Sequence, residues 1–229
     1  MNSGFDIKRI AGDGYLIVPL SMSRLANPPP PEKCYEIFDY FLGKFETLSN
    51  DVVLLYTNGL YMNSDDASLE LRKKMNGQAL NHAVALRNLI HKSKDFIPNA
   101  FHFLPIDYPI LNAPQYTSYL AKLRKAEQSD AAFRDALMHD MAGREYNDAN
   151  ISFLLEEIVI THILRQRLVE LPRTLVHNDN WRLVVYPGQP LTSDKYQWQH
   201  GLLPQTDKSN PYAGGQYDFE QKAYIDFSA

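Results

Sequence analysis

A pair of serine hydroxyls stands where it could do chemistry. Ser21 and Ser23 come at the end of an apolar run that begins at Tyr15. A hydroxyl that follows a buried strand can serve as a nucleophile, because ligands of open α/β sheets bind outside the carboxyl ends of the strands. A serine at a strand end can equally cap the turn that follows it. The sequence alone leaves both interpretations open.

A carboxylate and a phenol extend this group. Glu157 interrupts a helical pattern that is otherwise apolar. Burying a carboxylate costs free energy unless a cation or a donor meets it, so Glu157 could hold a substrate ammonium group. The alternative is that Glu157 edges a solvent face and pairs with Arg165 or Arg167. Tyr186 ends an apolar strand pattern, which would bring its hydroxyl to the same rim of the sheet as the serines, although an ordinary aromatic residue can close a strand too.

A long helix predicted for residues 66–94 carries a basic stripe. Its core stripe consists of Met75, Ala79, Ala83, Leu86 and Ile90. At about 100° per residue, the opposite face carries Lys73, Arg87, His91 and Lys94, with Arg72 and Lys74 nearby. Residues 69–95 contain six Lys and Arg against two acidic residues, although the whole chain has a net charge of −4. Clustered cations bind phosphate backbones, but a solvated helix face gives the same pattern.

The elements that must position these residues alternate between strand and helix. Strands are predicted at 15–21, 51–57, 101–106, 174–176 and 181–186. Helices are predicted at 31–45, 66–94, 114–141 and 147–171. This alternation predicts an α/β fold with a mostly parallel sheet flanked by helices, in a single domain over residues 1–229. Its core covers about residues 14–192, and residues 193–229 form a tail to which no element is assigned.

Composition and missing motifs exclude several classes of protein. With 45% hydrophobic and 22% charged residues, the 229-residue chain can build a core. The single cysteine, Cys34, excludes an intrachain disulfide and favours a reducing, cytoplasmic compartment. No apolar run approaches the roughly 18–20 residues of a membrane span, and the chain has no glycine-rich phosphate loop, Gly-x-Ser-x-Gly elbow or His-x-x-x-His pair. We therefore expect no metal, no cofactor and no membrane partner.

The sequence resembles the tRNA-dependent cyclodipeptide synthases in the order of four elements. These are the strand with the serine, the basic helix, the helix with the glutamate and the strand ending in Tyr186-Pro187. The resemblance covers about residues 14–192, and Tyr186-Pro187 is similar to the subgroup with proline at that place. It implies a Rossmann-like domain related to the catalytic domain of class I aminoacyl-tRNA synthetases. It also implies that two aminoacyl-tRNAs are the substrates of an aminoacyl transfer that makes a cyclodipeptide, with no cofactor and no protein partner required.

The resemblance assigns roles to single residues. Ser21 matches the nucleophile, although reading back without gaps from the helix at 31–45 reaches Ser23. Glu157 matches the glutamate that binds the aminoacyl amino group, and Tyr186 matches the late tyrosine. Phe153 stands where the family commonly has a tyrosine, which removes one hydroxyl from the expected site. The basic stripe of the long helix would contact tRNA.

Two other functions fit the same residues. In a non-catalytic RNA- or nucleotide-binding α/β module, the serines would be turn residues and Glu157 a structural ion-pair partner. A conventional hydrolase is the third possibility, but the sequence shows neither its nucleophile elbow nor a recognisable triad. Detection of a cyclodipeptide would separate the first function from the other two.

Overall fold

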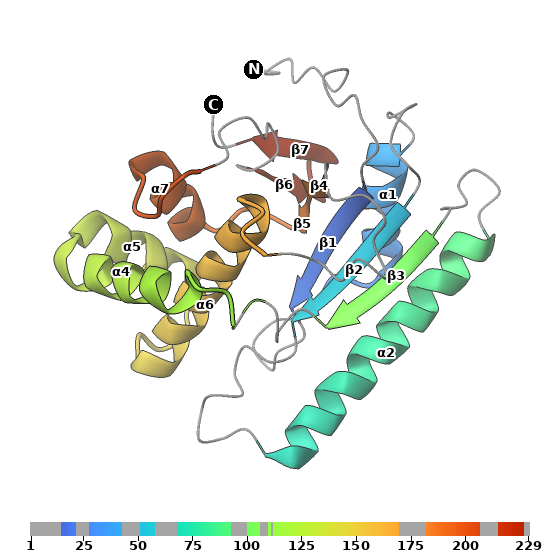
Figure 1. Ribbon diagram of the computed structural model, residues 1–229, viewed down its shortest axis with the longest axis horizontal. Helices are drawn as coiled ribbons and strands as arrows, with labels where there is room; N and C mark the ends of the chain where they lie inside the picture. The colour runs from blue at the N-terminus through green and yellow to red at the C-terminus, as the bar shows by residue number, and fades with distance from the viewer. Residues whose placement is uncertain are drawn as a thin grey trace.

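Four parallel strands form the main sheet, in the order β3-β2-β1-β4 (Figure 1). They are β1 (Tyr15–Ser21), β2 (Asp51–Thr57), β3 (Ala100–Pro105) and β4 (Arg182–Val184). The computed structural model describes residues 15–21, 28–42, 51–57, 68–92, 100–105, 110, 112–169, 182–206 and 215–226. The strand predicted at 174–176 lies outside these residues. The strand order reverses at β1, as in one half of a doubly wound nucleotide-binding fold.

Helices cover both faces of this sheet (Figure 1). They are α1 (Pro31–Leu42) and α2 (Leu69–Lys92) on one face and α6 (Asp148–Arg165) on the other, while α4 (Tyr116–Ser129) and α5 (Ala131–Asp140) lie beyond α6. Leu16, Val18 and Leu20 of β1 pack with α1 and α2, whereas Ile17 packs on the other face with α6. Burial on both faces explains why the middle residues of β1 and β2 are apolar without alternation. The predicted α/β fold with a parallel sheet between helices is confirmed.

Pro19 lies inside β1 although a proline cannot donate a hydrogen bond to a neighbouring strand. The carbonyl of Ile17 accepts from the amide of Val185, so the backbone N–H and C=O groups of Ile17 point toward β4. Backbone groups of every second residue in a strand point to the same neighbouring strand, so the nitrogen of Pro19 also points to the side of β4. The pairing of β1 with β4 ends at Ile17. Pro19 is therefore tolerated because β4 has already left the sheet edge at that point.

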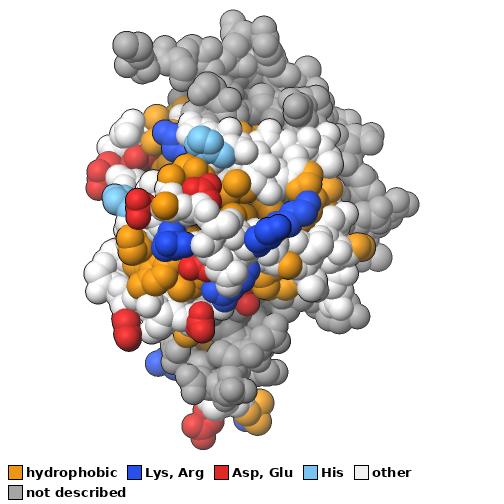
Figure 2. Space-filling view, turned by 90° about the vertical axis from the view of Figure 1, so that its left-hand side faces the viewer, with side chains coloured by type: hydrophobic (Ala, Val, Ile, Leu, Met, Phe, Trp, Pro, Cys, Tyr) orange, Lys and Arg blue, Asp and Glu red, His pale blue; other side chains and the backbone are white. Residues whose placement is uncertain are grey.

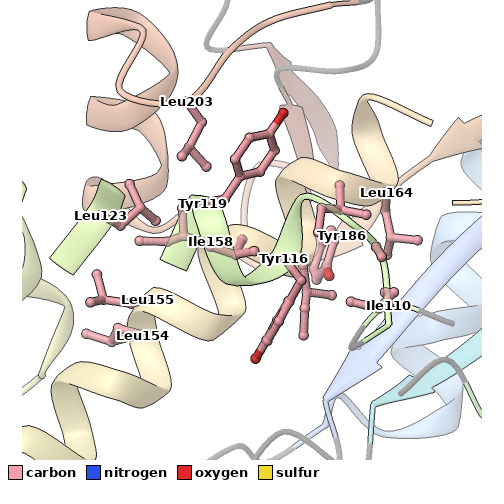
Figure 3. Packing of buried hydrophobic residues seen from close by; sticks show 14 of the residues in the cluster. Ile110, Tyr116, Tyr119, Leu123, Leu154, Leu155, Ile158, Leu164, Tyr186 and Leu203 are labelled. Carbon is pink, nitrogen blue, oxygen red and sulfur yellow. The ribbon is translucent and has the colours of Figure 1, made fainter. Parts of the chain in front are cut away.

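The core stripe predicted for α2 is confirmed, since Met75, Ala79, Ala83, Leu86 and Ile90 are all buried. The apolar middle of α6 is buried as well, as its all-round pattern predicts. Tyr116, Tyr119 and Leu123 of α4 lie against Leu155 and Ile158 of α6 (Figure 3). The helix that carries Glu157 is thus enclosed by the sheet on one side and by α4 on the other.

Two helix predictions need correction. The helix predicted over 114–141 is divided at Asp130, whose backbone is extended (φ −113°) and whose carboxylate accepts from the amides of Ala132 and Phe133. An aspartate N-cap of this kind begins a new helix, α5. The helix predicted to reach 171 ends at Arg165, because Arg167 takes a left-handed backbone with φ 56°.

The tail left unassigned by the sequence contains regular structure. It holds α7 (Thr192–His200), β6 (Gly215–Asp218) and β7 (Ala223–Asp226). β6 pairs in parallel with the two-residue strand β5 (Tyr186–Pro187) and antiparallel with β7. β5 begins two residues after β4 ends, so this second, small sheet lies beside the β4 edge of the main sheet (Figure 1). Tyr186 therefore lies near the rim of the main sheet, as predicted.

Within the described residues, we find no helix that is long and apolar enough to cross a membrane.

Candidate active site

A cavity of about 300 Å³ opens at the carboxyl end of β1. Four of the residues selected from the sequence line it together: Ser21, Phe153, Glu157 and Tyr186. They come from β1, α6 and β5, which are far apart along the chain. The cavity lies where the strand order reverses between β1 and β4, the place at which open α/β sheets bind their ligands.

Ser21 is the last residue of β1 and pairs with Thr57 of β2. Its Oγ is buried and has no hydrogen-bond partner among the described residues. A buried hydroxyl without a partner is costly to the fold, so its presence favours a role toward a molecule in the cavity. The rival nucleophile Ser23 lies outside the described residues, and the choice between the two serines stays a prediction.

The wall formed by α6 follows from the spacing of its residues. Asn147 caps the helix by accepting from the amide of Asn150 at 3.0 Å. Phe153, Glu157 and Thr161 are four residues apart and therefore lie one above the other on the side that faces the cavity. Phe153 is buried and supplies an aromatic surface where the resemblance led us to expect a hydroxyl. The one carboxylate of this row thus sits between an apolar ring and a hydroxyl.

Tyr186 brings a buried phenol to the opposite wall. Burial raises its pKa, and the nearby carboxylate of Glu157 raises that pKa further, so the phenol stays protonated at neutral pH. Thr161 lies beside the phenol, but Oη of Tyr186 has no partner among the described residues at the distance and angle of a hydrogen bond. The guanidinium carbon of Arg165 lies 5.5 Å from the centre of the ring. Tyr186 can therefore act as a neutral hydrogen-bond donor in the cavity.

A buried ion pair stands behind Tyr186. Nη1 of Arg165 lies 2.6 Å from Oδ2 of Asp194 in α7, and both side chains are buried. Nη2 of Arg165 donates to the carbonyl of Gly215 in β6 at 3.0 Å. Gln197 donates to the other oxygen of Asp194. Arg165, which the sequence offered as a partner for Glu157, thus joins α6 to the C-terminal elements.

The neighbouring glutamate, Glu156, faces α4 and does not line the cavity. Burial and the charge of Glu157 raise the pKa of Glu156 to about 7, while Arg124 of α4 lowers it. The carboxyl also raises the pKa of Tyr116 in α4. The two adjacent glutamates therefore occupy different sides of α6, and Glu156 provides a matched reference for substitutions of Glu157.

The cavity also contains residues that the sequence analysis did not select. Thr161 lies one helical turn beyond Glu157, so the four-residue spacing was a usable signal. Arg144 comes from the connection between α5 and α6, and Gln216 comes from β6. Neither lies in a local pattern that indicates a site. The core predicted over about 14–192 also omits Gln216.

The face of α2 that was predicted to be basic carries both basic and apolar side chains. Lys73, Lys74, Arg87 and His91 are exposed on α2, whereas Lys94 and the side chain of Arg72 lie outside the description. Leu80 and Val84, about half exposed, stand between them on the same face. Nε of Arg87 lies 3.3 Å from Nε2 of His91, which accepts this bond only when that nitrogen is unprotonated.

The side of the molecule formed by α4, α5 and α7 has a different charge pattern. Lys and Arg side chains alternate there with Asp, Glu and hydrophobic side chains (Figure 2). Over the described atoms of this view, the two signs of charge are mixed rather than separated. We therefore use lysines of this side, Lys125 and Lys195, as references for the basic residues of α2.

Comparisons with known proteins show what the fold is similar to. No family model matches the chain, and no curated protein sequence is similar to it. The structure of a cyclodipeptide synthase from Fluoribacter dumoffii matches with a TM-score of 0.55 and 14% identity, covering 86% of this chain and 85% of that chain. The cyclodipeptide synthase from Candidatus Glomeribacter gigasporarum bound to Phe-tRNAPhe matches with a TM-score of 0.55 and 13% identity, covering 86% of each chain. The chain thus has the fold of these synthases.

Proposed function

We propose that this protein is a tRNA-dependent cyclodipeptide synthase, an aminoacyltransferase that works through a seryl intermediate. The observation that supports this most directly is the cavity that gathers Ser21, Glu157 and Tyr186 at the reversal of the strand order. The solved structures with the same fold are cyclodipeptide synthases, and one of them is bound to Phe-tRNAPhe. We place the reaction in the cytoplasm, where aminoacyl-tRNA is made.

In the first step, Oγ of Ser21 attacks the ester carbonyl of an aminoacyl-tRNA. A bond forms between Oγ and the acyl carbon, and the bond from that carbon to the ribose oxygen breaks. None of the described residues that line the cavity is a histidine, so the serine proton passes to the leaving ribose oxygen. The ester already carries the activation, which is consistent with the lack of a phosphate-binding loop in the sequence.

In the second step, Glu157 and Tyr186 orient the amino group of the acyl-enzyme. The carboxylate of Glu157 binds the ammonium, takes up one of its protons and later releases it to solvent, which leaves a free amine that attacks the ester carbonyl of the second aminoacyl-tRNA. A peptide bond forms, the bond from that carbonyl carbon to the ribose oxygen breaks, and a proton of the attacking amine passes to this oxygen as the second tRNA leaves. The new terminal amine then attacks the ester on Ser21, which releases the cyclodipeptide and returns a proton to Oγ.

The direct test uses purified protein and a complete set of aminoacyl-tRNAs, with cyclodipeptides detected by mass spectrometry. We expect at least one cyclodipeptide with the wild type and none with a doubly substituted Ser21→Ala, Ser23→Ala protein. A protein that binds tRNA but yields neither acyl-enzyme nor cyclodipeptide would instead be the non-catalytic RNA-binding module.

Glu157→Gln is expected to lower cyclodipeptide formation about 30-fold or more. The substitution keeps the shape of the side chain and removes the charge that would bind the ammonium group, and such charge-assisted bonds in desolvated sites contribute about 2–5 kcal/mol. Glu156→Gln is the matched control, because Glu156 faces α4. The measurement is the initial rate of product formation. Equal rates for the two variants would make Glu157 a structural residue.

Lys73→Gln together with Arg87→Gln is expected to weaken tRNA binding at low salt. If both residues contact phosphates, the slope of log Kd against log salt should fall by about 1.4–1.8, because each contact contributes about 0.7–0.9. Both side chains are exposed, so the melting temperature should stay nearly unchanged. Lys125→Gln together with Lys195→Gln removes the same charge elsewhere and should leave the slope unchanged. The same slope in both double variants would mean that tRNA docks away from α2.

A further inference from the structure

A hydrogen-bonded group beside the cavity has no part in the chemistry proposed above. Nε2 of His82, a half-buried residue of α2, lies 2.8 Å from the carbonyl oxygen of Pro29. Nδ1 of His82 lies 2.8 Å from Oη of Tyr56 in β2. Sγ of Cys34 in α1 lies 3.7 Å from the same carbonyl of Pro29. One imidazole therefore connects α2, the sheet and the segment that leads into α1.

The chemistry of the partners defines the state of each group. A carbonyl oxygen only accepts, so Nε2 of His82 carries a hydrogen and donates it to Pro29. Burial lowers the pKa of His82, which keeps the ring neutral and leaves Nδ1 to accept from the hydroxyl of Tyr56. Burial raises the pKa of Cys34 to about 12, so this residue remains a thiol that donates weakly to Pro29. Both nitrogens of the imidazole are thus used to hold neighbours.

The segment that His82 holds is a run of four prolines, residues 28–31. Proline has no backbone N–H, so these residues can form hydrogen bonds with the rest of the protein only through their carbonyl oxygens. The carbonyl of Pro30 accepts from the amides of Lys33 and Cys34, which begins α1. The carbonyl of Pro29 is left for side chains, and His82 provides its short hydrogen bond.

Pro28 and Pro29 line the same cavity as Ser21. We propose that His82 is a positioning residue that holds the Pro28–Pro29 wall of the cavity and thereby determines which aminoacyl side chains fit. This inference rests on the proposed function, because it takes the aminoacyl group as the molecule in the cavity. α2 also carries Lys73 and Arg87, so the helix proposed to bind tRNA is the helix that holds the wall beside the acyl group.

The position of the wall can be tested without substrate. In His82→Leu, the amides of Lys33 and Cys34 should exchange hydrogen about tenfold faster by NMR, because the carbonyl of Pro29 loses its donor and the start of α1 loosens. His82→Gln keeps a donor and an acceptor and should restore slow exchange. Gln78→Leu, one turn earlier on the exposed side of α2, is the matched control and should leave these amides unchanged. Unchanged exchange in His82→Leu would overturn the proposal.

Substrate selection provides the second measurement. We expect His82→Leu to lower kcat/KM of acylation about tenfold for the aminoacyl-tRNA that the wild type prefers, mainly by raising KM. The ratio of kcat/KM between this aminoacyl-tRNA and the others should therefore become smaller. His82→Gln should recover the preference. Faster exchange with an unchanged preference would overturn the role in selection. If the wild type forms no acyl-enzyme at all, the proposed function fails, while the exchange measurement still decides whether His82 holds the wall.

Tyr56→Phe keeps the experiment decisive if His82→Leu does not fold. It removes only the hydroxyl that donates to Nδ1 of His82, so the imidazole stays in place but loses its fixed orientation. The amides of Lys33 and Cys34 should then exchange faster than in the wild type. Exchange as slow as in the wild type in Tyr56→Phe, combined with slow exchange in a folded His82→Ala protein, would contradict the proposal.

Discussion

Ser21→Ala is expected to abolish the acyl-enzyme and to lower cyclodipeptide synthesis at least about 1,000-fold, since removing a nucleophile costs that much or more in enzymes with covalent intermediates. Oγ of Ser21 is buried in the cavity with no partner among the described residues, so its removal leaves no atom there to carry the acyl group. The measurement is acid-stable label on the protein after incubation with radiolabelled aminoacyl-tRNA, with the labelled residue located by mass spectrometry.

The same substitution should leave the fold intact and its melting temperature equal or higher. Removing a buried hydroxyl that lacks a partner relieves a desolvation cost. Ser23→Ala is the matched control and should label as the wild type does. Normal labelling of Ser21→Ala with loss of label in Ser23→Ala would move the nucleophile by two residues. Normal labelling of both variants would overturn the covalent mechanism at these positions.

Asp194→Leu is expected to lower the free energy of unfolding by about 3–5 kcal/mol, because it leaves the guanidinium of Arg165 buried without its counter-ion. For a chain of this size, that loss corresponds to a fall in melting temperature of about 6–20 °C. The large effect follows from burial: both side chains are almost completely inaccessible to water. Thermal denaturation followed by circular dichroism measures it.

Two further variants show whether the loss of stability in Asp194→Leu comes from the broken ion pair or from poorer packing. Arg165→Met combined with Asp194→Leu replaces the pair by apolar side chains and should recover much of the lost stability. Glu36→Gln breaks an ion pair with Lys33 whose two side chains are both partly exposed, and it should change the melting temperature much less than Asp194→Leu does. An Asp194→Leu protein that melts with the wild type would show that the pair adds nothing to the fold.

The parts of the fold that the sequence predicted are those with a long, regular pattern. β1 and β2 each have five consecutive buried apolar residues, 16–20 and 52–56, because both faces of these strands are covered. The stripe of α2 repeats over about four turns of helix, from Met75 to Ile90. Ser21 and Glu157 were found for a related reason: each is a polar residue that interrupts or ends an apolar pattern, and such a position is costly without a function.

The parts that the sequence missed depend on contacts between distant residues. β5, β6 and β7 have two to four residues each, too few for a period to be recognised. Arg165 and Asp194 are charged residues in ordinary helical surroundings, and only the folded chain shows that they meet. The break at Asp130 had a local signal, since an aspartate before an alanine-rich turn is a typical N-cap, but the helical pattern continues across it.

The central place of β1 has a consequence for the order in which the site is assembled. β1 precedes the other described elements in the chain, yet residues 15–17 pair with residues 182–184, and the cavity-lining residue furthest along the chain is Gln216. A growing chain that still lacks β6 contains Ser21, Glu157 and Tyr186, but the guanidinium of Arg165 has not yet met the carbonyl of Gly215. The cavity is thus complete only after the chain has been synthesised past Gln216, long after Ser21 has been made.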